Sequence, residues 1–189
     1  RIGSDWSSDV CSSDLLELLS KESIMSEYPL KKIIRYNHRS RLQDESVAEH
    51  TCFVSLFCLK IMAQLNLTHE QERQVLILAA LHDTCESRTS DIPHDVKANY
   101  PEMQQILDRI EQDYYKEHWK NYLGEVYKPE PIVYNILKLA DAYSVYQWCL
   151  NEKALGNSSD CIGEIYFESK ERIDKYTNEI NKLIEKEAK

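Results

Sequence analysis

Two helix-capping boxes, each followed by apolar residues at helical spacing, constrain this chain more than any other sequence feature. In Ser46–Glu49 and Thr68–Gln71, a hydroxyl residue precedes an acid or amide by three positions, so the two can satisfy each other's backbone N–H groups. The spacing of the apolar residues predicts a helix from Val47 to about Leu65 and a second helix that contains Val75–Leu81. That second run is apolar nearly all round, so we expect a central, buried helix.

Helical spacing continues through the rest of the chain. It predicts helices from Glu102 to about Leu123, from Ile132 to Leu155 and from about Cys161 to Lys189. Pro93 is well placed to begin a short helix, and Gly156 has the position of a helix C-cap. The chain has only four glycines and five prolines, too few for the frequent turns of a β-protein, and no linker divides it. We therefore expect an all-α fold with a single helical domain.

The first fourteen residues differ from the rest of the chain. They are rich in serine and aspartate, lack apolar periodicity and resemble the translation of a common sequencing-adaptor oligonucleotide. Our hypothesis is that residues 1–14 are a non-native assembly artefact or a disordered tail, and that residues 15–189 form the domain. A biological coding sequence upstream of Leu15 in the source DNA would refute the artefact.

Composition narrows the classes of partner. The 23 basic and 32 acidic side chains give a net charge of −9, which argues against binding polymeric nucleic acid but allows a small anionic substrate. The longest apolar run, Val75–Leu81, is too short to span a bilayer, so we expect no membrane contact. Six cysteines form no CxxC pair and no signal-peptide pattern is visible, so we expect reduced thiols and a cytoplasmic protein.

Histidines and aspartates in apolar surroundings indicate a metal site. Asp83 and Asp141 interrupt apolar segments, where an unpaired carboxylate loses hydration worth several kcal/mol. Taken singly, His50 could be an ordinary core histidine and Asp141 a helix-capping residue. Together with His82, they offer two imidazoles and two carboxylates, a set that suits one first-row divalent ion such as Mn, Co, Fe or Zn. Water bound to such an ion can act as a nucleophile near neutral pH.

Four ordered motifs carry a family resemblance. They are Glu45–His50 (ESVAEH), Leu81–Glu86 (LHDTCE), Ser90–Lys97 (SDIPHDVK) and Leu139–Ala142 (LADA). The chain resembles the HD-domain metal-dependent phosphohydrolases, and most closely their bacterial 5′-deoxynucleotidase branch, from about Arg35 to Asn157. The resemblance implies an all-α HD-domain helical bundle and a homodimer. It implies hydrolysis of deoxyribonucleoside 5′-monophosphates to deoxynucleoside and phosphate, with one divalent ion such as Co²⁺ or Mn²⁺.

The resemblance also implies roles for individual residues. The metal ligands would be His50, His82, Asp83 and Asp141. Glu86 matches the family's catalytic glutamate. On a helix Asp83 and Glu86 would be neighbours at i and i+3, so we expect Glu86 to point into the site without binding the metal.

The remaining candidates concern the substrate. By resemblance, Asp91 belongs to the catalytic water and substrate network, and Arg35 contacts the phosphate with a planar guanidinium that suits its oxygens. Tyr36 replaces a family tryptophan that packs on the deoxyribose, and Ser90 replaces a glycine. Lys97 is a second candidate cation for substrate binding, or else a solvated helix residue.

Two other functions are compatible with the motifs. One is a dNTP triphosphohydrolase of the same superfamily, as in phage proteins that remove dATP, because the same metal set can serve either phosphorus atom. The other is a non-catalytic helical metal-binding module, which would be expected to lack Glu86 or Arg35, and both are present.

Overall fold

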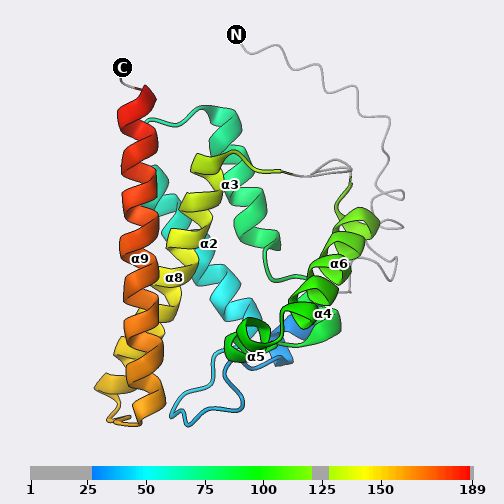
Figure 1. Cartoon of the computed structure of the whole chain (residues 1–189), viewed down its shortest axis with the longest axis vertical. Helices are drawn as coiled ribbons and strands as arrows, with labels where there is room; N and C mark the ends of the chain where they lie inside the picture. The colour runs from blue at the N-terminus through cyan, green and yellow to red at the C-terminus, as the bar shows by residue number, and fades with distance from the viewer. Residues whose placement is uncertain (1–26, 121–127, 188–189) are drawn as a thin grey trace, which may run out of the picture.

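The computed structural model describes residues 27–120 and 128–187, and in these ranges the chain is helical with one isolated β-bridge (Figure 1). The helices are the 3₁₀ helix η2 (Tyr28–Lys32), α2 (Val47–Met62), α3 (His69–Leu81), α4 (Glu86–Thr89), α5 (His94–Asn99), α6 (Pro101–His118), α8 (Pro131–Ala154) and α9 (Asp160–Glu187). The all-α expectation is confirmed. The hypothesis on residues 1–14 lies outside the described residues.

Helix α8 is the centre of the bundle. It packs along α9 on one side and against α2 and α3 on the other, and α2 also packs on α3 (Figure 1). The main core lies between these four helices, and its buried side chains are Val54, Cys58, Met62, Val75, Leu78, Ala79, Leu81, Ile132, Val133, Ile136, Leu137, Ala140 and Ile180. No helix in the described ranges is long and apolar enough to cross a membrane.

The predicted helix starts are confirmed by both capping boxes, but some ends differ. Helix α2 ends at Met62 rather than near Leu65, because the backbone N–H groups of residues 64 and 65 bond the carbonyl oxygens three residues back and tighten the chain into a turn. Helix α8 begins at Pro131, where proline is tolerated in the first turn. After it ends, Gly156 adopts a φ of +99°, as its predicted C-cap position requires.

The expectation that α3 is a central, buried helix is wrong. Leu76 is 38% exposed and Ala80 is also exposed, whereas Val75 and Ala79 on the other face are fully buried. Helix α3 covers α2 and α8 from one side only, so its outer face remains in solvent although it is apolar.

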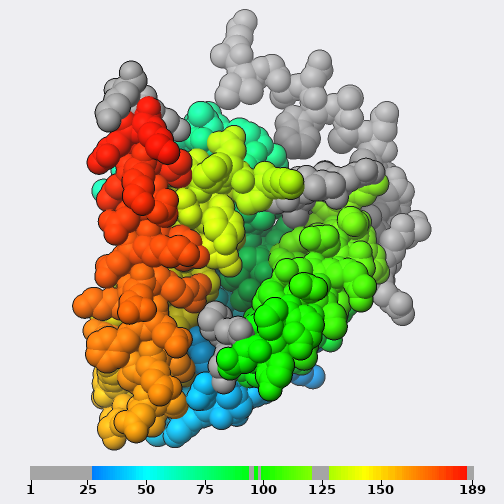
Figure 2. All heavy atoms as spheres, in the orientation of Figure 1, coloured from blue at the N-terminus to red at the C-terminus, as the bar shows by residue number. Residues whose placement is uncertain are grey.

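Helices α5 and α6 form a second flank of the molecule. They pack on each other, and Figure 2 shows them on the opposite side of the molecule from α9. Helix α6 starts at Pro101, one residue before the predicted start, and ends at His118 with Trp119 as its C-cap, so the prediction of one helix to about Leu123 is wrong; residues 121–127 lie outside the described residues.

The segment that precedes α2 is tied to the bundle by a short β-bridge. Ile34 pairs with Ser46, and next to this pair the backbone N–H of Arg35 donates to the carbonyl oxygen of Glu45 at 2.9 Å. The backbone of Arg35 is therefore held beside the residues that immediately precede α2.

A buried carboxylate on α8 holds the loop between the two halves of this bridge. Glu152 accepts hydrogen bonds from the backbone N–H groups of Leu42 and Gln43, each at 2.8 Å, and from the side-chain amide of Asn157 at 2.7 Å. The loop before α2 is thus anchored to the C-terminal part of α8.

Candidate metal and phosphate-binding site

His50 lies in the first turn of α2 and its ring is fully buried. Its Nδ1 lies 3.1 Å from the hydroxyl oxygen of Ser144 on α8. When Nδ1 donates to this hydroxyl, Nε2 carries the free lone pair of the neutral ring. Burial, followed by the positive charge of Arg35, lowers the pKa of His50 to about 4 and keeps the ring neutral at pH 7.

His82 follows directly after α3, at its C-cap position. Its Nδ1–H donates to the carbonyl oxygen of Ala79 at 2.9 Å, so its Nε2 has only a lone pair to offer in the neutral ring. The rings of His50 and His82 lie 5.5 Å apart, centroid to centroid. Two imidazole lone pairs from separate elements therefore open onto the same small volume.

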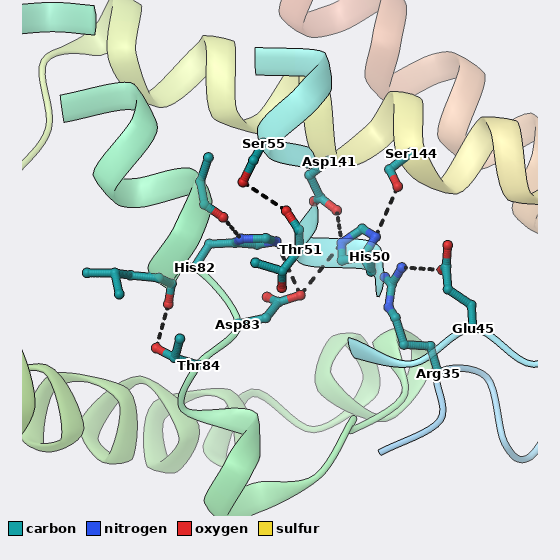
Figure 3. A network of polar contacts seen from close by, with 12 residues as sticks. Arg35, Glu45, His50, Thr51, Ser55, His82, Asp83, Thr84, Asp141 and Ser144 are labelled. Atoms are coloured by element: carbon teal, nitrogen blue, oxygen red, sulfur yellow. Dashed lines mark hydrogen bonds and ion pairs between the residues drawn. The ribbon is translucent and has the colours of Figure 1, made fainter. Parts of the chain in front are cut away.

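Two carboxylates face these nitrogens. Asp83 Oδ2 lies 3.2 Å from His82 Nε2 and 3.6 Å from His50 Nε2, and Asp141 Oδ1 lies 3.3 Å from His50 Nε2. Figure 3 shows the four side chains pointing toward one another from α2, from the turn after α3 and from α8. Ligand atoms of His50, His82 and Asp83 lie within 4.8 Å of one another, and Asp141 adjoins this group through His50.

This donor set fits a divalent cation. Among the described residues, the buried Nε2 atoms of His50 and His82 have no hydrogen-bond partner, although both face carboxylate oxygens. Lone pairs that converge in this way repel one another unless positive charge lies between them. Burial opposes protonation of His82, yet the carboxylate of Asp83 raises the pKa of its ring, so this part of the site attracts positive charge.

Glu86 is the first residue of α4 and lies beside the cluster. The expectation that Asp83 and Glu86 share a helix is wrong, because α3 ends at Leu81 and Asp83 lies in a turn between α3 and α4. The backbone N–H of Glu86 donates to the carbonyl of Asp83 at 3.1 Å, which preserves the close spacing. Burial and then the charges of Asp83 and Asp91 raise the pKa of Glu86 to about 9.

Arg35 provides a fixed cation at the edge of the cluster. Its Nη1 donates to Glu45 Oε2 at 3.1 Å, and its side chain is only 11% exposed. Burial works against the charged form, but Tyr36, Glu45, Asp83 and Asp141 together keep its pKa above the ordinary value. Glu45 thus holds one nitrogen of the guanidinium group, and the carboxylates of Asp83 and Asp141 are close enough to raise the pKa of Arg35.

Asp91 and Tyr36 are joined directly. The backbone N–H of Tyr36 donates to Asp91 Oδ2 at 3.0 Å, and Tyr36 adopts a φ of +53°, a strained value for a residue with a bulky side chain. The ring of Tyr36 stacks on that of Trp148 on α8, with centroids 4.6 Å apart. Asp91 therefore fixes the backbone that presents this aromatic ring. Ser90, which precedes Asp91, has a φ of +61°, a left-handed value that glycine adopts readily.

A cavity of about 690 Å³ opens beside the cluster and is lined by residues of both α9 and α5. Its lining includes Tyr36 and Arg39 from the segment before α2, Asn99 of α5 and Arg172 of α9. Lys97 lies on α5, close enough to Glu86 for its positive charge to offset part of the rise in the pKa of that carboxyl. The structure thus brings all nine predicted site residues to one region between α2, α4, α5 and α8.

Three residues of this region were not predicted from the sequence. Ser144 and Trp148 follow Asp141 by three and seven positions on α8, so the helical period that placed Asp141 could also have indicated them. Arg172, which donates to Asp141 Oδ2 at 2.6 Å, gives no such signal because it is one of many charged residues of α9.

The chain is similar to known proteins over most of its length. A family model described as 5′-deoxynucleotidase YfbR-like matches residues 24–187. A 5′-deoxynucleotidase of Shewanella oneidensis is 29% identical over 161 residues, which cover 77% of each chain. A 5′-deoxynucleotidase of Vibrio cholerae is 27% identical over 161 residues, which cover 77% of this chain and 78% of that protein.

Solved structures share the fold at lower identity. The PH0347 protein of Pyrococcus horikoshii has a TM-score of 0.66 and 20% identity, and the match covers 84% of this chain and 94% of that one. The HD phosphohydrolase DatZ of cyanophage S-2L, bound to dA and one catalytic Zn²⁺, has a TM-score of 0.62 and 20% identity, with 85% and 95% covered. These likenesses show that the fold is that of the HD-domain phosphohydrolases.

Proposed function

Since this chain belongs to the YfbR-like 5′-deoxynucleotidase family, we propose that it hydrolyses deoxyribonucleoside 5′-monophosphates to deoxynucleoside and phosphate. The observation that carries the proposal is the convergence of two buried imidazole lone pairs and two carboxylates beside an arginine and a carboxyl of raised pKa. A phosphomonoesterase needs these groups to bind a cation, hold the phosphate and move a proton.

We propose that His50, His82, Asp83 and Asp141 hold one divalent ion. A set of imidazole nitrogens and carboxylate oxygens favours a first-row divalent ion such as Zn²⁺, Mn²⁺ or Co²⁺, and it needs no thiolate ligand. When bound, such an ion supplies a Lewis acid for the phosphate oxygens and lowers the pKa of a bound water. Ser144 and the carbonyl of Ala79 contact the Nδ1 atoms of the two rings, which would leave both Nε2 atoms available to hold the ion.

The chain's own residues hold the phosphate and transfer the proton. Arg35 would bind a phosphate oxygen with the part of its guanidinium that Glu45 leaves open. As water attacks phosphorus and the P–O5′ bond breaks, Glu86 would give its proton to O5′. The resulting carboxylate takes the proton that the attacking water loses, which restores Glu86 for the next cycle.

The nucleoside would extend into the 690 Å³ cavity, whose volume is in the range of small-molecule sites. Tyr36 would pack against the deoxyribose there, backed by Trp148 and fixed by Asp91. Lys97 on α5 would add positive charge for the phosphate on the side of Glu86.

The decisive experiment measures phosphate release from dNMPs and NMPs with Mn²⁺, Co²⁺ or Zn²⁺. We expect turnover of the deoxynucleotides by the unmodified protein and a loss of at least about a hundredfold in His82→Ala, Asp83→Asn and Glu86→Gln. His69→Ala is the matched control, because His69 is a fully exposed histidine at the start of α3. Undiminished activity in Asp83→Asn would contradict the assignment.

Product analysis separates the two enzymatic alternatives. Deoxynucleoside triphosphates are incubated with the metal-loaded protein, and the products are resolved by anion-exchange chromatography. Release of inorganic triphosphate would show the triphosphohydrolase reaction, whereas phosphate release from dNMPs alone supports the monophosphatase. Metal binding without hydrolysis of any nucleotide would indicate the non-catalytic module.

We infer that the protein forms a homodimer. Phe53, Leu56 and Leu59 lie on the outer face of α2 and are 49%, 47% and 47% exposed, an apolar surface that a second copy could cover. Light scattering would test the stoichiometry, and Leu56→Glu would be expected to yield monomers. A monomer of the unmodified protein at micromolar concentration would contradict the inference.

We also propose that the protein works in the cytoplasm, where nucleotides are metabolised. The five cysteines in the described ranges are free, which fits a reducing compartment. For the native chain we propose a domain that excludes residues 1–14, and sequencing of the source DNA tests this.

A further inference from the structure

The carboxylate of Asp141 is divided between two partners. Oδ1 lies 3.3 Å from His50 Nε2, whereas Oδ2 accepts a hydrogen bond from Arg172 Nη2 at 2.6 Å. Arg172 comes from the middle of α9, a helix that carries none of the residues predicted for the site. Its side chain is 36% exposed and that of Asp141 is 14% exposed, so the pair lies where the site meets the neighbouring cavity.

A carboxylate can bind a metal ion through one oxygen or through both. A catalytic site needs open positions on the ion for water and a substrate oxygen, so a ligand that occupied two positions would take one of them. Because Oδ2 is held by a charge-assisted hydrogen bond, only Oδ1 of Asp141 is directed at the histidines.

We propose that Arg172 is a positioning residue, which holds Oδ2 of Asp141 and thereby directs Oδ1 to the metal ion. This inference rests on the proposed function, in which Asp141 is a metal ligand. It also gives α9 a part in the site, because a residue of the helix that covers α8 would then orient a ligand that α8 carries.

Two competing roles for Arg172 make different predictions. If Arg172 acted only through its charge, it would repel the ion, and its removal would strengthen metal binding. If Arg172 instead bound the substrate, its removal would raise the KM for the nucleotide and leave metal binding unchanged. An orienting role predicts weaker metal binding, since outer partners of metal ligands typically contribute 10-fold to 100-fold in affinity or activity.

The experiment titrates Mn²⁺ into chelator-treated protein by calorimetry and compares Arg172→Met, Arg172→Lys and Lys170→Gln. Lys170 is an exposed residue of α9, so Lys170→Gln removes the same charge from the same helix without touching Asp141. Circular dichroism checks that each variant is folded. Lysine keeps the charge and a donor but loses the guanidinium fork, and it serves as the test if the methionine variant does not fold.

We expect Arg172→Met to bind Mn²⁺ about tenfold more weakly, Arg172→Lys to lie between it and the unmodified protein, and Lys170→Gln to be unchanged. At saturating Mn²⁺, kcat should fall in Arg172→Met while the KM for the nucleotide stays the same. Equal or tighter Mn²⁺ binding by Arg172→Met, or a change confined to KM, would overturn the proposal.

Titration of Asp141→Asn with Mn²⁺ distinguishes a wrong role for Arg172 from a wrong proposed function. If Asp141→Asn loses Mn²⁺ binding while Arg172→Met retains it, only the role of Arg172 is wrong. If Asp141→Asn binds Mn²⁺ normally, the proposed ligand set itself is wrong, and the role of Arg172 is overturned with it.

Discussion

The contribution of the buried Glu152 carboxylate to the stability of the fold depends on pH. Burial alone would raise its pKa, but the hydrogen bonds from Asn157, Leu42 and Gln43 lower the pKa below the ordinary value of 4.5. The ionised carboxylate therefore stabilises the fold above about pH 4.5, and this stabilisation is lost as the pH falls through the lower, folded-state pKa.

We accordingly expect Glu152→Gln to lower the free energy of unfolding by about 1–3 kcal/mol at pH 7, because one or two N–H groups lose their acceptor. The difference from the unmodified protein should shrink as the pH is lowered below 4.5. Urea denaturation between pH 3 and pH 7 measures both effects. Glu164→Gln, at an exposed position of α9, is the control, and a destabilisation that did not vary with pH would contradict the argument.

Ser144 is expected to contribute to metal binding without touching the ion. Ser144→Ala leaves Nδ1 of the buried His50 ring without its hydroxyl partner, so the ring is no longer held in one orientation. Mn²⁺ affinity, measured by calorimetry, should fall about tenfold. Ser55→Ala is the control, because the Ser55 hydroxyl bonds the carbonyl of Thr51 on the same helix and does not contact the ring. Unchanged affinity in Ser144→Ala would exclude this role.

At the scale of helices, the two capping boxes should differ in energetic weight. Ser46 is buried, pairs with Ile34 in the β-bridge and precedes the turn that carries His50, whereas Thr68 caps the exposed start of α3. We expect Ser46→Ala to cost about 1–2 kcal/mol of unfolding free energy and Thr68→Ala about 0.5–1 kcal/mol. Chemical denaturation of both variants measures the difference, and an equal cost would show that burial of the cap adds nothing.

The capping boxes and apolar spacing are local signals, so they predicted where α2, α3 and α8 begin to within a residue. The ends of helices are less well specified, and α2 is shorter than its apolar pattern because the chain tightens into a turn after Met62. The turn that contains Asp83 was predicted to be helical because it has no glycine or proline. Its geometry depends on contacts with other elements, which the local sequence does not reveal.

The arrangement of whole elements was beyond local signals. That His50 and Asp141 meet results from the packing of α2 on α8; their residue types suggested a shared metal ion, and the order of the motifs in the family resemblance strengthened that prediction. Arg172 was missed because its partner lies 31 positions away on another helix, and an arginine in a charged helix is usually solvated.

For the molecule as a whole, a bound ion should act as a cross-link between α2, the turn after α3 and α8. A ligand at 100 times its Kd adds about 2.7 kcal/mol to stability, which for a chain of this size raises the melting temperature by roughly 5–10 °C. We expect this shift on adding Mn²⁺ or Zn²⁺ to chelator-treated protein in differential scanning fluorimetry.

The shift should be lost in Asp83→Asn and retained in His69→Ala, since His69 lies far out in solvent. An equal rise in both variants would mean that the ion binds somewhere else.

Helix α8 presents Asp141, Ser144 and Trp148 from one side over two turns, and each residue inserted into a helix rotates the remainder of that helix by about 100°. A single insertion between positions 141 and 148 would therefore turn the indole away from Tyr36 while leaving the aspartate where it is. Homologous chains should consequently vary in length within their connecting loops but keep the same number of residues between positions 141 and 148.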